Sequence, residues 1–314
     1  MLAAGSELIR PATMSFPYVT DVVNAVFGTQ WQLPVPVFGI VVLAAVFLST
    51  LVFSREVARR ETLGVVPAGT GSLVADLVFV AVITGILGAK VFHLLEYTDE
   101  VLDHPASMIF SRNGFSIYGG LCFGTVAAIF FLVRRRVPVL PMLDAAAPAM
   151  MLGYAVGRLG CQLSGDGDWG VAADLALKPS WLPDWLWAQT YENNIAGVAI
   201  AAPGVYPTPL YETAMALALA WLLWTLRSHR HRAGFLFSVY LIFAGLERLL
   251  IEKIRINARY SVLDFAVTQA EVISFALVLA GCIAALVTLR VRSVLPRVIF
   301  TVLVLTTLSA CVCL

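Results

Sequence analysis

Long apolar runs recur along this chain and constrain its fold more than any other feature. An α-helix needs about 20 mainly apolar residues to cross the hydrocarbon core of a bilayer. Such stretches lie at 34–53, 73–95, 116–133, 141–160, 209–226, 234–252, 270–289 and 295–314. Charged residues make up only 13% of the chain, about half of the roughly 25% that is typical of soluble proteins. An ordinary soluble domain is therefore excluded, and we expect an all-α integral membrane protein with seven or eight transmembrane helices.

The connections between the apolar runs are short with one exception, so we expect one transmembrane bundle domain over 34–294. Residues 1–33 precede it and place aromatic residues beside prolines, which suits an arm at the membrane interface. These residues do not have the pattern of a secretory signal. The last stretch, 295–314, is predicted as an additional transmembrane helix.

The long connection covers 161–208 and is rich in tryptophan and proline. Tryptophan is enriched where a protein meets the membrane surface. The connection is therefore predicted as an interfacial arm outside the membrane, with a plain extracellular excursion as the alternative. Its tryptophans are Trp169, Trp181, Trp185 and Trp187.

Basic residues cluster in alternate connections, which indicates orientation because cytoplasmic loops carry an excess of lysine and arginine. The clusters are Arg55, Arg59 and Arg60; 134–136; Arg227, Arg230 and Arg232; and Arg290, Arg292 and Arg297. The opposite connections are acidic or mixed. We therefore expect these clusters in the cytoplasm and the N-terminus outside.

The segment GRLGCQLSGDGDWG, from Gly157 to Gly170, places an arginine where a span becomes a loop. A charge inside a membrane span is costly and is a functional hypothesis by default. Arg158, Gly157, Asp166 and Asp168 are therefore candidate site residues, and the glycines of the loop allow close approach of a ligand. The alternative is an arginine that only extends to the interface from a helix end.

A second group of charges ends the stretch 234–252. Residues four and seven apart share a helix face, which puts Arg248, Glu252 and Arg255 in one stripe. The stripe has a net positive charge and is a candidate anion site. Alternatively, it is a self-neutralising network that only holds helices together.

Two further segments open spans from the outside. SIYGGL contains Tyr118, Gly119 and Gly120, and YPTPLYE contains Glu212 in the first turn of a predicted helix. By the predicted orientation, all four segments lie toward the outer half of the bilayer. We expect their arginines to meet there with few carboxylates to cancel them, which suits a phosphate-bearing anion because guanidinium groups match its oxygens. A phospholipid head group is the anion most accessible to such a site.

These four segments, in their order along the chain, resemble the motifs of the prolipoprotein diacylglyceryl transferase family over about 36–260. GRLGCQLSGDGDWG is the most specific of them, and GLERLLIEKIR, from Gly245, completes the set. The resemblance implies that Arg158 binds phosphatidylglycerol and that Arg248 is the second essential arginine. Tyr118, Tyr206 and Cys161 stand where the family commonly has histidine, histidine and asparagine. Phe38 replaces a tyrosine and Lys90 an arginine.

The resemblance implies transfer of a diacylglyceryl group from phosphatidylglycerol to the lipobox cysteine of a lipoprotein precursor, in the bacterial cytoplasmic (inner) membrane. The predicted catalytic residues are Arg158, Arg248 and Tyr118. The predicted substrate-binding residues are Gly157, Arg158, Gly119, Gly120, Asp166, Asp168, Glu212, Glu252 and Arg255. We expect membrane lipids as partners, and no cofactor, metal or nucleic acid. The alternatives are a transporter or flippase for an anionic lipid or phosphate, and an inactive lipid-binding relative.

Overall fold

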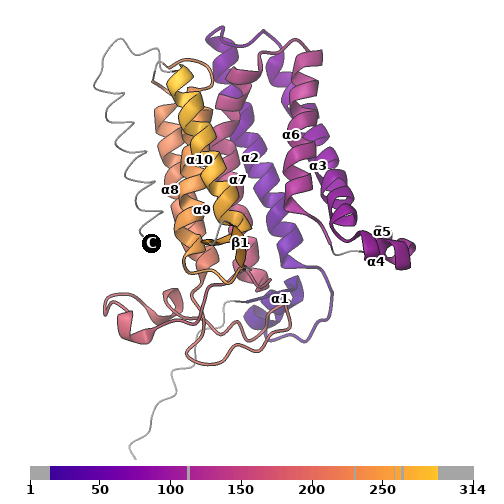
Figure 1. Ribbon diagram of the computed structural model, residues 1–314, viewed down its shortest axis with the longest axis vertical. Helices are drawn as coiled ribbons and strands as arrows, with labels where there is room; N and C mark the ends of the chain where they lie inside the picture. The colour runs from indigo at the N-terminus through magenta and orange to yellow at the C-terminus, as the bar shows by residue number, and fades with distance from the viewer. Residues whose placement is uncertain (1–14, 112–113, 230, 258, 263–264, 289–314) are drawn as a thin grey trace, which may run out of the picture. The chain divides into compact units, whose positions relative to one another are not determined.

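A computed structural model describes residues 15–111, 114–229, 231–257, 259–262 and 265–288 (Figure 1). The stretch 295–314, predicted as an additional span, lies outside the described residues, as do the first fourteen residues of the N-terminal arm. Within the described residues the chain divides into two compact units. One comprises the described residues up to Ser49 together with those from Ala147 onward, and the other comprises the described residues of Thr50–Ala146.

Six helical segments among the described residues are long and apolar enough to cross a membrane. They are Val37–Thr62 (α2), Thr70–Glu96 (η1, Thr70–Leu73, with α3, Val74–Glu96), Ile117–Arg134 (α6), Val139–Ser164 (α7), Thr208–Leu226 (α8) and Gln269–Thr288 (α10). The chain is thus a multi-pass helical membrane protein, as predicted. The finer count of seven or eight stays a prediction.

Helix α9, Phe235–Glu252, is the predicted span that does not meet this description. It has 18 residues and is mostly apolar, but Glu247, Arg248 and Glu252 all lie in it. Helix α9 nevertheless belongs to the bundle, since it packs along both α8 and α10. Its charged residues are concentrated in its last turns.

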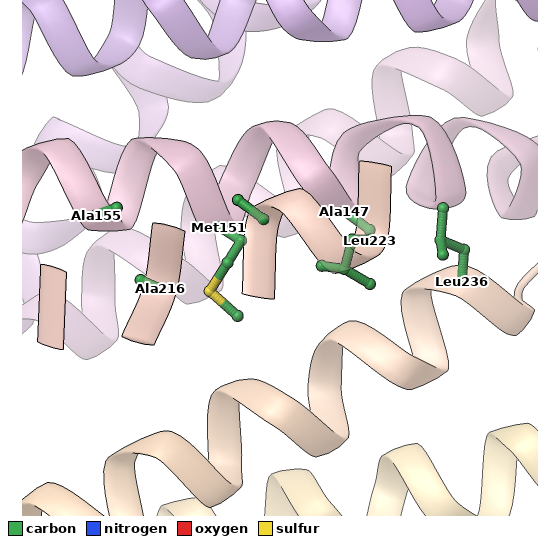
Figure 2. Close-up of a cluster of buried hydrophobic side chains, with 7 residues drawn as sticks. Ala147, Met151, Ala155, Ala216, Leu223 and Leu236 are labelled. Atoms are coloured by element: carbon green, nitrogen blue, oxygen red, sulfur yellow. The ribbon is translucent and has the colours of Figure 1, made fainter. Parts of the chain in front are cut away.

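The core of the first unit lies where α7, α8 and α9 meet. Small residues alternate with large ones there, so that the helices come close and the large side chains fill the remaining space. The labelled members are Ala147, Met151, Ala155, Ala216, Leu223 and Leu236 (Figure 2). This packing fixes the ends of α7, α8 and α9 that carry the charged side chains.

Glycines bring α9 and α10 into close contact. A Cβ at Gly245 would lie 2.7 Å from the Ser274 carbonyl oxygen, and one at Gly281 would lie 2.8 Å from the Ser238 carbonyl oxygen. Small residues at such positions are how membrane helices approach each other without a strong hydrophobic driving force.

In the second unit, α3 and α6 pack through glycines in the same way. A Cβ at Gly119 would overlap the Gly88 carbonyl, and one at Gly120 would lie 3.4 Å from the Gly85 carbonyl oxygen. Two short helices, α4 (Thr98–Asp103) and α5 (Pro105–Phe110), connect α3 to α6. At the other end of the unit, the buried carboxylate of Glu56 pairs with Arg60 at 2.9 Å.

The long connection begins after α7 at residue 165 and ends before α8 at 207. It contains only two short 3-10 helices, Leu175–Leu177 (η2) and Asp184–Leu186 (η3). It has a small core of its own, formed by Trp169, Tyr191 and Val205. The connection is therefore a folded part of the molecule, and its place at the membrane interface stays a prediction.

Three smaller elements complete the described chain. Helix α1, Val19–Phe27, lies in the N-terminal arm and ends at Gly28 in the left-handed conformation. The strands β1, Arg259–Val262, and β2, Phe265–Thr268, form an antiparallel hairpin between α9 and α10. Neither the hairpin nor the helices α4 and α5 were predicted.

Candidate functional site

Arg158 projects from the last turns of α7 and is the first member of the candidate site. Its side chain is only 14% exposed. The guanidinium Nε donates a hydrogen bond of 3.2 Å to the hydroxyl oxygen of Tyr154, one helical turn earlier. The guanidinium also lies 5.2 Å from the centre of the Tyr154 ring. Tyr154 therefore fixes the direction in which Arg158 points.

Glu212, in the first turns of α8, is fully buried and is the centre of the cluster. Its Oε1 accepts hydrogen bonds from the Tyr154 hydroxyl at 3.0 Å and from Arg248 Nη1 at 3.1 Å. Its Oε2 lies 3.2 Å from Arg158 Nε and 3.6 Å from Arg255 Nη1. A buried carboxylate is stable only when it is paired, and three arginines pair with this one.

Asp168 joins two of these arginines from the loop that follows α7. One carboxylate oxygen pairs with Arg158 Nη1 and the other with Arg255 Nη2. The Thr208 hydroxyl donates a 2.7 Å hydrogen bond to the Asp168 backbone carbonyl, which ties the loop to the start of α8. Burial would raise the pKa of Asp168, but the charges of Arg158 and Arg255 outweigh it and lower the pKa. Asp168 is accordingly ionised at neutral pH.

Arg248 and Glu252 form an ion pair along α9, with Nη2 and Oε2 separated by 3.3 Å. Asn257 donates a 2.6 Å hydrogen bond to the other carboxylate oxygen of Glu252. Arg255 differs from the predicted stripe, because α9 ends at Glu252 and Arg255 follows in a bridge to Gly170. Its ion pairs go to Asp168 and Glu212 and not to Glu252.

The structure thus brings together Arg158, Arg248, Arg255, Asp168, Glu212 and Glu252. The expectation of few carboxylates near the arginines was wrong, because each arginine pairs with at least one of them. The reason is burial: an unpaired guanidinium here would lose its hydration without compensation. Any anion must therefore compete with carboxylates that are already in place.

Gly157 and Asp166 flank Arg158 in different ways. A Cβ at Gly157 would meet no described atom within 4 Å, so there is open space beside Arg158. Asp166 accepts a 3.2 Å hydrogen bond from the backbone N–H of Asp168. Burial and the charge of Asp168 raise the pKa of Asp166. Gly153, one turn earlier in α7, instead packs closely on α2, because a Cβ there would lie 2.5 Å from Ser49 Oγ.

Cys161, Asp166 and Asp168 each offer a possible metal ligand, and these atoms lie within 4.8 Å of one another. The charges around them oppose a cation, however. Arg158 Nη1 is 3.7 Å from the Cys161 sulfur, and Asp168 is already paired with two guanidinium groups. Asp168 is therefore already engaged by two arginines in this arrangement and is poorly placed to bind a cation.

Tyr118, Gly119 and Gly120 lie in the second unit, in the first turn of α6. Tyr118 is half-buried there, and Ser116 is the N-cap residue of the helix. The two glycines contact α3 closely, which gives them a packing role. Their roles toward a substrate stay predictions.

Sequence reasoning missed two members of the cluster, Tyr154 and Glu247. Glu247 is 4% exposed, and its Oε1 has no hydrogen-bond partner among the described residues. Tyr154, Glu212, Arg158 and Arg248 surround it. The signals were available: Tyr154 stands four residues before Arg158 on one helix face, and Glu247 is a charge inside a span.

Fold and site together define a class: a multi-pass helical membrane protein with a buried cluster of paired arginines and carboxylates. The family model of prolipoprotein diacylglyceryl transferase matches residues 25–287. The chain belongs to this family.

Relatives named phosphatidylglycerol–prolipoprotein diacylglyceryl transferase agree with this assignment. The protein of Bacillus cereus is 32% identical over 251 residues, which cover 80% of this chain and 86% of that protein. The protein of Lysinibacillus sphaericus is 28% identical over 79% of this chain and 86% of its own. The protein of Leptospira interrogans is 26% identical over 77% of each chain.

Proposed function

We propose that this protein transfers the diacylglyceryl group of phosphatidylglycerol to the lipobox cysteine of lipoprotein precursors. It is a transferase of lipoprotein maturation, as the names of its relatives indicate. The observation that carries the proposal is the cluster of Arg158, Arg248 and Arg255 around Glu212 at the ends of α7, α8 and α9. Guanidinium groups bind phosphate oxygens with matched geometry.

The reaction is an alkyl transfer. The thiolate of the precursor attacks the glyceryl carbon, the new carbon–sulfur bond forms, and the bond from that carbon to the phosphate oxygen breaks. Glycerol phosphate leaves with the electron pair. Arg158 and Arg248 stabilise the charge on the leaving phosphate, and such stabilisation is strong in a poorly hydrated site.

The thiol must lose its proton, and its ordinary pKa of about 8.5 leaves only a small thiolate fraction at neutral pH. Nearby arginines raise that fraction by stabilising the anion. Tyr118, which stands at the position of a family histidine, supplies a hydroxyl that accepts or relays the proton. Gly157, Gly119, Gly120 and Asp166 are proposed substrate-binding residues, and Glu212, Glu252 and Asp168 orient the arginines.

The proposed setting is the bacterial cytoplasmic membrane, with seven or eight spans. The N-terminus is outside, and the connection before α8 forms an interfacial arm. The distribution of the basic clusters supports this orientation. The alternative is a lipid transporter that binds the lipid through the same arginines but does not cleave it. Binding of phosphatidylglycerol without cleavage would favour this alternative.

The proposal is tested by incubating the purified protein with phosphatidylglycerol and a peptide that contains a lipobox. We expect the mass of the peptide to increase by one diacylglyceryl group. A peptide with serine in place of the lipobox cysteine is the control and should stay unmodified. If the cysteine peptide is unchanged while folded protein still binds the lipid, the chain is a lipid-binding or lipid-transport protein.

A further inference from the structure

Asp168 is the most exposed member of the charged cluster. Its side chain is 34% exposed, compared with 14% for Arg158 and 7% for Arg255. It therefore covers the two arginines from the accessible side. Its two carboxylate oxygens go to different guanidinium groups. A phosphate group that entered the cluster would present its oxygens to the same donors.

Arg255 is left incompletely bonded by this arrangement. Its Nε and Nη1 are buried and have no hydrogen-bond partner among the described residues. The carboxylate oxygen Oε2 of Glu212 lies 3.6 Å from Nη1, which is too far for a hydrogen bond. Buried donors without partners are unfavourable and rare in native structures. An anion with more oxygens than a carboxylate would satisfy donors that Asp168 leaves unused.

The backbone at Asp168 is held in place by the start of α8, whereas its side chain is partly exposed. The Thr208 hydroxyl holds the backbone carbonyl at 2.7 Å. Gly167, just before it, has a φ of +100°, which a residue with a side chain rarely adopts. A rotation of the partly exposed carboxylate toward water would free Arg158 and Arg255 without rebuilding the loop.

On the basis of the proposed function, we propose that Asp168 is an internal anion that occupies the phosphate position when no lipid is bound. The phosphate of phosphatidylglycerol displaces it, and Arg255 is then a phosphate ligand beside Arg158. Return of the carboxylate helps glycerol phosphate to leave after the transfer. Asp168 is thus a competitor of the substrate and not one of its ligands.

The first test uses the variant Asp168→Asn, which keeps the size of the side chain and removes its charge. A binding site that is open only part of the time has an apparent affinity reduced by that fraction. If the carboxylate occupies the site for about nine-tenths of the time, its removal lowers the KM for phosphatidylglycerol about tenfold. Inhibition by glycerol phosphate becomes stronger by the same factor.

Asp184→Asn is the matched control, because Asp184 lies in the same connection and its carboxylate pairs, among the described residues, only with Lys178, at 2.9 Å. It should leave the KM for phosphatidylglycerol and the inhibition by glycerol phosphate unchanged. A folded Asp168→Asn protein with an unchanged or higher KM would contradict the proposal, because a residue that only orients the arginines would weaken binding when removed.

The second test uses the unaltered protein and needs no transfer. A water-soluble carbodiimide with an amine labels accessible carboxylates, and peptide mass spectrometry measures the label at Asp168. Vesicles of phosphatidylethanolamine with an equal amount of phosphatidylglycerol should increase this label severalfold over vesicles of phosphatidylethanolamine alone. The label at Asp184 should not change.

An Asp168 that is equally or less labelled with phosphatidylglycerol would overturn the displacement, even if the peptide is modified normally. Labelling as expected in a protein that never modifies the peptide would instead refute the proposed transferase and keep the displacement.

Discussion

Arg158 shows how single residues acquire their function from their neighbours. As an arginine at the end of α7 it could simply extend to the membrane interface, but its side chain turns inward to Tyr154, Glu212 and Asp168. Three partners fix the guanidinium before any ligand arrives. Such preorganisation is what makes electrostatic stabilisation of a developing charge effective.

Replacement of Arg158 should therefore reduce transfer in a graded way. Arg158→Lys keeps the charge but loses the forked geometry, so it should be impaired, and Arg158→Ala should be impaired more. Loss of one charge-assisted contact costs about 1.5 to 3 kcal/mol, or roughly ten- to a hundredfold in catalytic efficiency. Transfer rates at several lipid concentrations, with folded protein verified by size-exclusion chromatography, measure this. Unchanged efficiency in Arg158→Ala would move the phosphate site elsewhere, first to Arg248.

Tyr118 offers a second test at the residue scale. Tyr118→Phe removes only the hydroxyl and should lower transfer, whereas Tyr118→His restores the side chain that the family commonly has and should retain or increase it. The single-turnover transfer rate to a lipobox peptide checks both. Full activity of Tyr118→Phe, with no gain from histidine, would show that the hydroxyl does not take part in proton transfer.

The residue scale also shows what sequence could and could not predict. Arg158, Arg248 and Glu212 were recognisable because charge in an apolar run is conspicuous. The ion pairs of the cluster were not recognisable. Asp168 and Arg255, for example, are 87 residues apart in sequence and meet only after the loop and the end of α9 have folded. The sequence predicted more arginines than carboxylates at this site. That prediction was wrong for the same reason.

At the scale of elements, the apolar runs predicted five helices to within a residue at each end, whereas α2 and α7 end several residues past their runs. The run 34–53 became α2, Val37–Thr62, because the charged residues of its last turns are satisfied by one another, as in the Arg60–Glu56 pair at 2.9 Å. Helix α8 begins at Thr208, whose hydroxyl donates a hydrogen bond to the backbone carbonyl of Asp168. The short helices α4 and α5 and the hairpin β1–β2 were not predicted, since none has a long periodic pattern.

Close packing of α9 on α10 gives a prediction about stability. Alanine favours a helix over glycine by about 1 kcal/mol, yet Gly245→Ala would place a methyl group 2.7 Å from the Ser274 carbonyl oxygen and from a Val278 methyl. Overpacking of this kind typically costs about 1 to 3 kcal/mol. We expect Gly245→Ala to lower the Tm of the detergent-solubilised protein.

Gly39→Ala is the control, because its methyl would find only Pro36 Cγ at 4.0 Å. It should leave the Tm unchanged or raise it slightly. An equal Tm for both variants would show that α9 and α10 are not in contact at Gly245.

At the scale of the whole molecule, the alternating basic clusters predict one orientation in the membrane. Single cysteines at 135 and 228 should be protected from a membrane-impermeant thiol reagent added to intact cells, and a cysteine at 184 should react. The experiment is run in a background without the native cysteines. Labelling at 135 together with protection at 184 would reverse the orientation and put the arginine cluster on the cytoplasmic side.

The central claim is that the arginine cluster supports cleavage of phosphatidylglycerol coupled to modification of a cysteine. The most direct measurement follows both products in one reaction, the glycerol phosphate released from head-group-labelled phosphatidylglycerol and the diacylglyceryl-modified lipobox peptide. The account predicts that the two appear in equal amounts, that neither appears with the serine peptide, and that both decrease together in Arg158→Ala. Glycerol phosphate released without modified peptide, or neither product from folded protein, would contradict it.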